Sequence, residues 1–334
     1  MRAWVVRRPG PIRESPLVLE DRPIPQPGPT DALIRVLACG LCRTDLHIAE
    51  GELPPVRSDV TPGHQIVGVV EQVGAAVRGL SPGQRVGVTW LASACGACDL
   101  CLRGDENLCE EARFTGYHVD GGYAEYAVAR AGYAFPLPAD VPDTEAAPLL
   151  CAGVIGYRAL RMARARQTRR LGLAGFGASA HLAIQVARYW GCEVYVFTRG
   201  TAHQRLALAM GAAWAGEARD DPGVGLDSAI IFAPAGDLVP AMLDRLARGG
   251  TLVINAVYMS PIPSLNYRRL YWEKAVRSVA NVTREDVRAF LDLAARIPVR
   301  ATVQTYAFEQ AAEALIDVAD GRIEGAAVLM VAAP

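Results

Sequence analysis

Four cysteines about a third of the way along the chain restrict its fold more than any other part of the sequence. They follow the pattern C-x2-C-x2-C-x7-C and comprise Cys95, Cys98, Cys101 and Cys109. Four thiolates held by short loops form a closed tetrahedral zinc site, which keeps no coordination position for a substrate and therefore stabilises structure. The spacing predicts a zinc-bound lobe here.

Two other kinds of site also use clustered cysteines. Iron–sulfur clusters of the bacterial ferredoxin type have the spacing C-x2-C-x2-C-x3-C-P, which differs from the spacing here. A zinc module that binds nucleic acid needs basic surroundings, because acidic side chains repel phosphates. The stretch around the cysteines contains Asp99, Asp105, Glu106, Glu110 and Glu111. Both alternatives remain open, and the structural zinc site is favoured.

The size and charge of the chain narrow its class. At 334 residues it exceeds the ~250–300 residues at which single cores stop growing, so we expect two domains. Its 34 basic and 35 acidic side chains nearly balance, which argues against a broad surface for nucleic acid or membrane. The sequence shows neither a signal-peptide pattern nor an apolar run near the ~18 residues of a membrane span. We therefore expect a cytoplasmic protein with reduced cysteines and no nucleic-acid or membrane partner.

The hydrophobic pattern changes near residue 150. Before it, short β-like runs broken by Pro and Gly predict a β-rich domain. After it, strands alternate with helices, beginning with a strand at 170–174 and a helix at 178–189. This alternation is typical of βαβ units and predicts an α/β domain with a parallel sheet.

A glycine-rich turn joins that strand to that helix. It contains Gly175, Gly177, Ala178 and Ala180, which fit the G-x-G-x-x-G/A fingerprint of dinucleotide-binding proteins. The first glycine permits a tight turn, the second lets the backbone approach the pyrophosphate, and the alanine lets helix and strand pack closely. The phosphates of the cofactor would lie at the N-terminus of the helix.

The next strand ends without the acidic residue that usually binds the ribose of NAD. Thr198 and Arg199 stand at that position, with His203 and Arg205 as less certain helpers. A hydroxyl and an arginine fit a 2′-phosphate better than a bare ribose, so NADP is favoured. NAD remains open, because an arginine there can also stack on adenine.

A second group of metal-binding residue types is dispersed along the chain. Cys42 stands in Gly-Leu-Cys-Arg-Thr-Asp-Leu-His, His64 stands in Pro-Gly-His-Gln, and Cys151 stands in Leu-Leu-Cys-Ala-Gly. Two cysteines and one histidine around zinc leave the fourth position for water or substrate, which is the catalytic arrangement. Taken singly, Cys39 and Cys151 could be ordinary buried side chains, as free cysteines usually are.

Taken in order, these motifs resemble the zinc-dependent medium-chain alcohol dehydrogenases, and the resemblance covers essentially the whole chain. It implies a GroES-like β-rich catalytic domain of residues 1–150 and 284–334, which includes the structural-zinc lobe. It implies a Rossmann cofactor domain, a doubly wound parallel sheet, of residues 151–283. It also suggests a homodimer or a homotetramer.

The resemblance assigns a catalytic zinc to Cys42, His64 and Cys151, in addition to the structural zinc. Asp45 would orient the ligand histidine and fix its tautomer. The alternative for Asp45 is a turn former or a helix cap. Cys39 has no ligand role in the family pattern, so we expect it to be a packing residue.

The resemblance also implies a proton relay. Thr44 resembles the hydroxyl that accepts a hydrogen bond from the alcohol, and His47 the base that passes the proton to solvent through the cofactor ribose. Without the resemblance, His47 would be interpreted as a solvated loop histidine. Arg43 matches a position that contacts the cofactor pyrophosphate. Trp90 resembles a residue that lines the substrate pocket in the family. The alternative interpretation of Trp90 is a tryptophan of the core or of an interface.

Gln65 departs from the family pattern, which commonly has Gly-His-Glu where this chain has Gly-His-Gln. A neutral amide removes a negative charge near the metal. We expect zinc binding to survive and water exchange at the metal to differ. A Gln65→Glu variant with unchanged turnover and unchanged pH dependence would contradict this expectation.

The sequence and the resemblance together predict an NAD(P)-dependent alcohol dehydrogenase that interconverts small alcohols with aldehydes or ketones by hydride transfer. The alternative with the same fold is a polyol or aromatic-alcohol (cinnamyl-type) dehydrogenase or aldehyde reductase. A zinc-stabilised binding protein without catalysis is disfavoured, because it would not need the relay residues. A zinc-free quinone reductase is disfavoured by the seven candidate zinc ligands.

Overall fold

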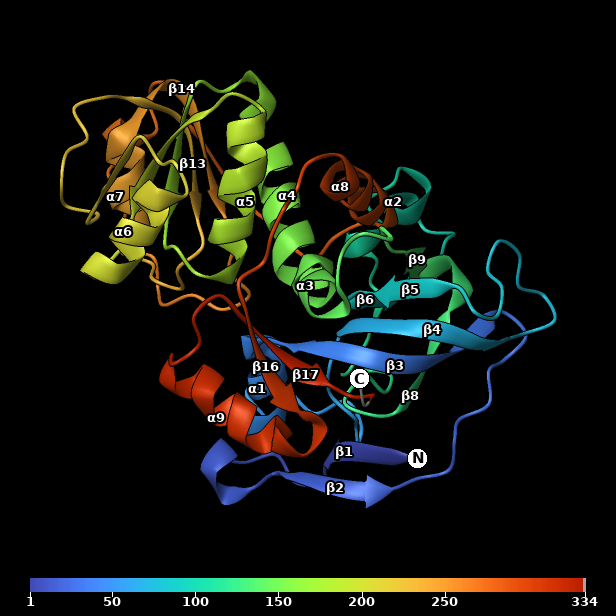
Figure 1. Ribbon diagram of the computed structural model, residues 1–334. Coiled ribbons are helices and arrows are strands. Elements are labelled where there is room, and N and C mark those ends of the chain that lie inside the picture. Colours follow the sequence, from blue (N-terminus) through green and yellow to red (C-terminus); the bar gives the residue numbers. More distant parts are fainter. Residues whose placement is uncertain (333–334) are drawn as a thin grey trace. The chain divides into compact units, whose positions relative to one another are not determined.

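Residues 1–332 are described in the computed structural model of the chain (Figure 1). The chain divides into two units. The first comprises Met1–Cys151, Asn281–Arg296 and residues 300–332, and the second comprises Ala152–Ala280 and Ile297–Val299. Of the helices in residues 1–332, none has both the length and the apolar composition that a membrane span requires.

A seven-stranded sheet organises the first unit. Its strands run in the order β16-β17-β3-β4-β5-β9, and β8 also pairs with β3. Their bounds are β3 (Asp31–Leu41), β4 (Gln65–Val73), β5 (Arg85–Val88), β8 (Tyr126–Arg130), β9 (Ala134–Pro136), β16 (Val303–Ala307) and β17 (Ala326–Met330). The end of β3 leads directly to Cys42, and β4 begins directly after His64. Because β3 and β4 are antiparallel, Cys42 and His64 lie at the same end of these two strands.

Short elements complete the first unit. They are β1 (Arg2–Val6), β2 (Leu17–Asp21), α1 (Arg43–Glu50), β6 (Leu91–Ser93), α2 (Asp99–Leu102), β7 (Arg113–Phe114), α3 (Asp143–Pro148), α8 (Arg284–Arg296) and α9 (Ala311–Asp320). Helices α1 and α9 lie side by side (Figure 1). The core contains large, fully buried side chains from the sheet and its connections, among them Ile34, Ile66 and Tyr123. The β-rich prediction for this part of the chain is confirmed.

A six-stranded parallel sheet organises the second unit. Its order is β12-β11-β10-β13-β14-β15, with helices on both sides (Figure 1). The strands are β10 (Arg170–Ala174), β11 (Glu193–Phe197), β12 (Trp214–Gly216), β13 (Leu226–Ile231), β14 (Leu246–Ile254) and β15 (Ala275–Ser278). The helices are α4 (Val154–Met162), α5 (Ala178–Tyr189), α6 (Thr201–Ala209) and α7 (Leu238–Arg245). The strand order reverses between β10 and β13, which is the switch point where doubly wound sheets bind ligands. The predicted parallel sheet is confirmed.

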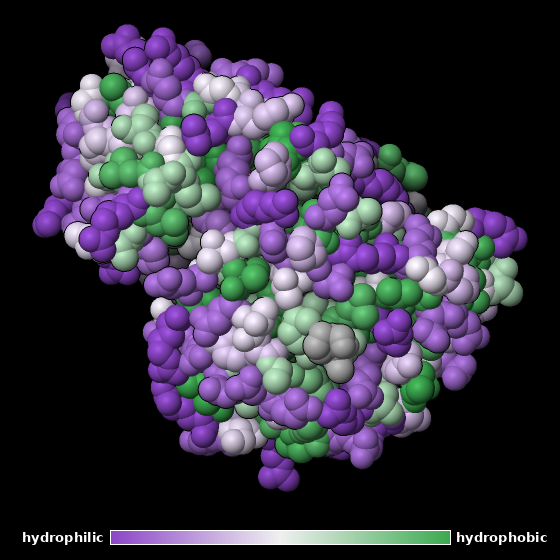
Figure 2. All heavy atoms as spheres, in the orientation of Figure 1, coloured by the Kyte–Doolittle hydropathy of each residue, from purple (hydrophilic) through white to green (hydrophobic). Residues whose placement is uncertain are grey.

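Hydrophilic residues cover much of the face drawn in Figure 2, and apolar residues form smaller groups among them. Every one of the eight cysteines, all within the described residues, is free of a disulfide.

Candidate metal and cofactor sites

Cys42 is held where β3 changes into α1. Its backbone is extended (φ −139°, ψ 159°), and its side chain caps the helix by accepting a hydrogen bond from the Thr44 amide at 3.5 Å. Asp45 Oδ2 accepts the Cys42 amide hydrogen at 2.8 Å, which completes a capping box. These hydrogen bonds at the N-terminus of α1 therefore fix the direction of the Cys42 thiol.

Asp45 also contacts His64 with its other carboxylate oxygen. Asp45 Oδ1 lies 3.0 Å from His64 Nδ1 and accepts the Gly63 amide hydrogen at 3.2 Å. Asp45 is fully buried and His64 is 1% exposed. A carboxylate can only accept hydrogen bonds, so Nδ1 carries the hydrogen and Nε2 is left to bind a metal. The cap and the orienting contact, predicted as alternatives for Asp45, are both present.

Gly63 brings the backbone close enough for these contacts. Its φ is +96°, and a Cβ there would lie 2.3 Å from Cδ1 of the fully buried Tyr123. Any larger residue would have to displace that ring. The glycine before His64 is therefore required by a positive φ and by close packing against Tyr123.

Cys151 completes a group of three candidate ligands. It lies in a π-helical stretch, Leu149–Gly153, and such stretches are frequent at functional sites. Its Sγ is 3.3 Å from His64 Nε2, and the ligand atoms of Cys42, His64 and Cys151 all lie within 4.8 Å of one another. Tetrahedral zinc with ordinary Zn–S and Zn–N bonds separates its ligand atoms by roughly 3.6–3.8 Å. The donor set and the spacing fit a zinc ion with one open position.

The electrostatics of this group favour a thiolate. The hydrogen bond with Cys151 lowers the pKa of Cys42 well below its usual range, against burial, and His64 lowers that pKa further. Burial lowers the pKa of His64, but Asp45 and Cys42 outweigh it and raise that pKa to about 10, so the Nε2 proton of the metal-free ring is the one that a zinc ion would displace. Cys39 lies outside the group, with no exposure, and its thiol contacts the Gly40 carbonyl at 3.7 Å.

The two predicted relay residues, Thr44 and His47, both lie on α1. Thr44 is 9% exposed, and its Oγ1 lies 3.6 Å from Cys42 Sγ. His47 lies one turn farther along, and its Nδ1 hydrogen-bonds Oε2 of Glu52. Glu52 belongs to none of the motifs in the sequence. A spacing of five residues is not a helical neighbour spacing, so no sequence signal marked this contact.

The remaining predicted residues of the first unit lie around this centre. The ring of Trp90 meets the ring of His64 edge to face, with centroids 5.0 Å apart, and stacks on Phe114 at 5.1 Å. Gln65 is 3% exposed and packs against Gly40, where a Cβ would lie 2.8 Å from its Cδ. Arg43 is exposed, and its Nη2 donates to the Val318 carbonyl of α9 at 3.2 Å.

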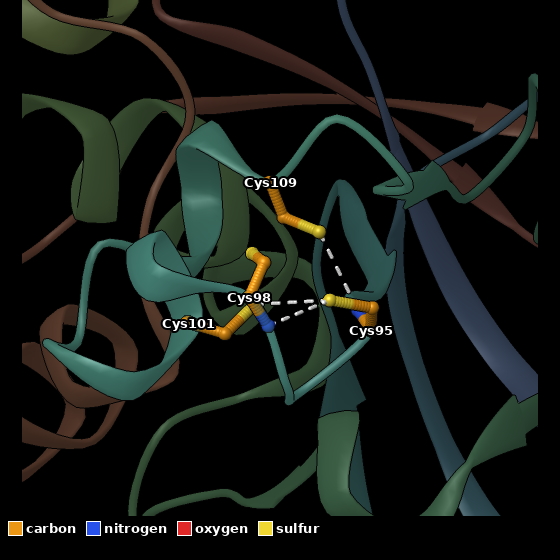
Figure 3. Close-up of side chains that lie close together, drawn as sticks. All are labelled: Cys95, Cys98, Cys101 and Cys109. Atoms are coloured by element: carbon orange, nitrogen blue, oxygen red, sulfur yellow. Dashed lines mark hydrogen bonds between the residues drawn. The ribbon is translucent and has the colours of Figure 1, made fainter.

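The four-cysteine lobe brings its thiols together, as Figure 3 shows. The sulfurs of Cys95, Cys98, Cys101 and Cys109 all lie within 4.8 Å of one another, and those of Cys95 and Cys101 are 3.8 Å apart. Backbone amides of Ala97 and Cys98 donate to Cys95 Sγ and lower the pKa of Cys95 to about 7. Zinc–sulfur bonds of ~2.3 Å give sulfur separations of about 3.8 Å in a tetrahedron, so this group also fits zinc.

The glycine-rich turn in the second unit follows β10. Gly175 has φ +91°, and a Cβ there would lie 2.8 Å from the Ala233 nitrogen. At Gly177 a Cβ would meet nothing within 4 Å, so that surface is open to a ligand. Helix α5 begins at Ala178, and Ala180 is fully buried where helix and sheet pack.

Thr198 and Arg199 follow β11 directly. Thr198 is 8% exposed, its amide donates to the Gly216 carbonyl at 2.8 Å, and its own carbonyl accepts from Gln204 Nε2 at 3.1 Å. Arg199 is exposed. The backbone of Thr198 is thus fixed, while the Arg199 guanidinium remains accessible.

Comparison with known proteins identifies the family. Residues 28–139 match the alcohol dehydrogenase GroES-like domain, and residues 180–296 match the zinc-binding dehydrogenase domain. A Mycobacterium tuberculosis protein named "Probable alcohol dehydrogenase AdhA" is 49% identical over 99% of this chain and 97% of its own length. The chain belongs to the zinc-dependent medium-chain alcohol dehydrogenase family. As a member, it is an oxidoreductase that acts on alcohols.

Solved structures of medium-chain alcohol dehydrogenases share its fold. A cinnamyl alcohol dehydrogenase from Sorghum bicolor has a TM-score of 0.90 at 26% identity and covers 98% of this chain and 97% of its own. A thermostable alcohol dehydrogenase from Pyrobaculum aerophilum, with cobalt and zinc bound, has a TM-score of 0.88 at 26% identity and covers 99% of both chains.

Proposed function

We propose that Cys42, His64 and Cys151 bind the catalytic zinc of this alcohol dehydrogenase, and that the chain oxidises small alcohols with NADP. The observation that supports this most strongly is the meeting of the three ligand atoms next to a buried carboxylate that contacts His64. When bound, zinc supplies a Lewis acid for the alcohol oxygen, and the dinucleotide supplies the hydride acceptor.

The protein's own groups hold and move the proton. Asp45 keeps the hydrogen on Nδ1 of His64 and so directs Nε2 to the metal. The Thr44 hydroxyl, fixed next to Cys42 Sγ, accepts the hydrogen bond of the substrate hydroxyl. The proton then passes to His47, which lies one turn farther along α1 than Thr44, and from His47 to water. Trp90 limits the space for the substrate beside His64.

The cofactor would bind with its pyrophosphate over Gly177 and at the N-terminus of α5, where the first backbone N–H groups have no helical partner. Arg43 would contribute a further positive charge to the pyrophosphate. Arg199 would bind a 2′-phosphate, because the chain has a threonine in place of the acidic residue that selects NAD.

A comparison of the two cofactors tests the proposal on NADP. We expect kcat/KM to be higher with NADP than with NAD, and Arg199→Gln to lower the NADP value about tenfold while leaving the NAD value within twofold. Arg169→Gln, which changes an exposed arginine just before the start of β10, at the other end of the sheet, is the matched control. A strong preference for NAD in the unchanged protein would contradict the proposal.

A substrate panel separates the two candidate activities. The rings of Trp90, Phe114 and Tyr117 stack beside His64, and this aromatic wall favours an aromatic alcohol as the second candidate. The panel should contain ethanol, propan-2-ol, a polyol and cinnamyl alcohol. A kcat/KM for cinnamyl alcohol far above the values for the small alcohols would make the chain an aromatic-alcohol dehydrogenase.

We propose a second, structural zinc at Cys95, Cys98, Cys101 and Cys109, which gives two zinc ions per chain. A Cys98→Ala variant should retain one zinc, lose thermal stability and keep turnover per folded molecule. Zinc at two per chain in this variant would contradict the assignment. The free cysteines agree with a location in a reducing compartment, and we propose that the protein is located in the cytoplasm.

We further propose a homo-oligomer that associates through the second unit. Strand β15 is an edge strand, and all four of its residues are exposed. Tyr267, Tyr271 and Trp272 are 70%, 58% and 45% exposed next to it. An open strand edge beside exposed aromatic side chains is typical of an interface, and we expect a second copy of the chain to pair with it. Val276→Glu should shift the mass measured by light scattering to that of a monomer.

A further inference from the structure

The chain reverses direction just after α1, and this reversal carries Glu52 back toward His47. Gly51 adopts the left-handed conformation (φ 78°) that ends the helix. The backbone amides of Glu52 and Leu53 then donate to the His47 carbonyl at 2.9 and 3.3 Å. The backbone around Glu52 is therefore fixed by two hydrogen bonds to the residue that its side chain contacts.

The side-chain contact joins Glu52 Oε2 to Nδ1 of His47. The His47 side chain is 16% exposed and the Glu52 side chain is 59% exposed. A carboxylate can only accept hydrogen bonds. The hydrogen of a neutral His47 ring is therefore held on Nδ1, and Nε2 keeps its lone pair. This is the form in which a histidine can take a proton.

The other charged groups on α1 and on the segments packed against it bind elsewhere. These pairs are Arg43 with the Val318 carbonyl, Asp45 with the His64 ring, Glu50 with the Ile12 amide, Arg13 with Asp320, Arg322 with Asp317 and Asp320, Glu313 with Gln310, Arg7 with Glu20 and Asp59, and Arg57 with Asp120. Glu14 lies on the short helix next to α1 and α9. Glu52 is the carboxylate that contacts the His47 ring.

We propose that Glu52 is a positioning residue for the proton relay, which holds the hydrogen of the His47 ring on Nδ1 and leaves Nε2 free to take the proton. This inference rests on the proposed function, because it takes His47 as the relay base. The carboxylate stabilises the imidazolium that forms when the proton arrives. It contacts Nδ1 and not Nε2, so it leaves Nε2 to the incoming proton.

The test is the pH profile of the single-turnover rate of alcohol oxidation, measured with zinc-loaded protein. Replacing the carboxylate by an amide removes the opposite charge, so Glu52→Gln should move the acidic limb about one pH unit lower. It should also lower the rate at pH 8 about fivefold. Glu52→Asp should restore part of the shift. Glu50→Gln, a change of the neighbouring carboxylate on α1, is the matched control and should leave the limb in place.

A second readout does not depend on turnover. The ring nitrogens of His47 should show the Nδ1–H tautomer in ¹⁵N spectra, with the signals assigned by their loss in His47→Gln. In Glu52→Ala the ring should lose this preference while the fold, followed by circular dichroism, is retained. An unmoved limb in Glu52→Gln and an unchanged tautomer in Glu52→Ala would overturn the inference. If His47→Gln itself left the limb in place, the relay role of His47 would fail, and the role of Glu52 with it.

Discussion

The change of Asp45 to asparagine tests how one buried carboxylate serves both the helix and the metal site. Asp45 accepts hydrogen bonds from the Cys42 amide, the Gly63 amide and the His64 ring. An asparagine has one accepting oxygen and one donating nitrogen. Whichever way the amide is turned, its NH2 group faces at least one donor of the protein.

The expected loss follows from these contacts. A hydrogen bond to a charged group contributes about 1.5–3 kcal/mol, and a buried donor without a partner costs a similar amount. Because Asp45 has no exposure, water cannot replace the lost acceptor. We expect Asp45→Asn to lower the free energy of unfolding by about 2–3 kcal/mol. We also expect it to weaken zinc binding by about 10–100-fold, as for other residues that orient a ligand histidine.

Two measurements check these numbers: urea unfolding of the zinc-loaded protein and competition for zinc with a chelator. Asp31→Asn is the control, because Asp31 accepts the Gly28 amide hydrogen in a surface turn, where asparagine serves equally well. We expect the control to change stability by less than about 0.5 kcal/mol. If Asp45→Asn matched this control in both assays, the dual role of Asp45 would be refuted.

The other predictions concern the zinc lobe and the cofactor turn. Burial raises the pKa of Glu106, but its hydrogen bonds with Arg284 outweigh burial and lower that pKa. Its contribution to stability is therefore present above its unfolded pKa of about 4.3 and disappears as the pH falls through the lower folded value. Glu106→Gln should cost about 1–3 kcal/mol in urea unfolding at pH 7, and this cost should fall progressively as the pH drops below about 4.3; a cost that stays constant over that range would contradict this. Gly175→Ala should lower Tm, because of its positive φ and the close Ala233 backbone, whereas Gly177→Ala should keep Tm and raise the KM for the dinucleotide. Thermal melts and cofactor titrations distinguish the two, and equal losses of Tm would contradict the prediction.

The sequence predicts the second unit with the most precision. The strand at 170–174 and the helix at 178–189 coincide with β10 and α5, because a buried strand, a glycine turn and an amphipathic helix give three local signals in succession. Helix α1 gave no such signal. Its cap is a cysteine, which is not among the usual capping residues, and its eight residues belong to a motif that was interpreted through the family.

The metal site could be predicted only in part. The four cysteines of the lobe are close in the sequence, so spacing alone suggested their common site. Cys42, His64 and Cys151 are far apart in the sequence, and their meeting depends on the pairing of β3 with β4 and on the π-helical stretch before α4. Only the resemblance to the family assigned these three residues to one zinc site. The contact of Glu52 with His47 depends on the left-handed conformation of Gly51, and no pattern in the sequence predicts this contact.

The zinc content and activity of Cys151→Ala test the central proposal most directly. The variant should be folded by circular dichroism, retain one zinc ion per chain in the four-cysteine lobe, and show no alcohol-dependent reduction of NADP. Two zinc ions per chain together with undiminished alcohol oxidation in this variant would contradict the assignment of Cys42, His64 and Cys151 as the catalytic metal site.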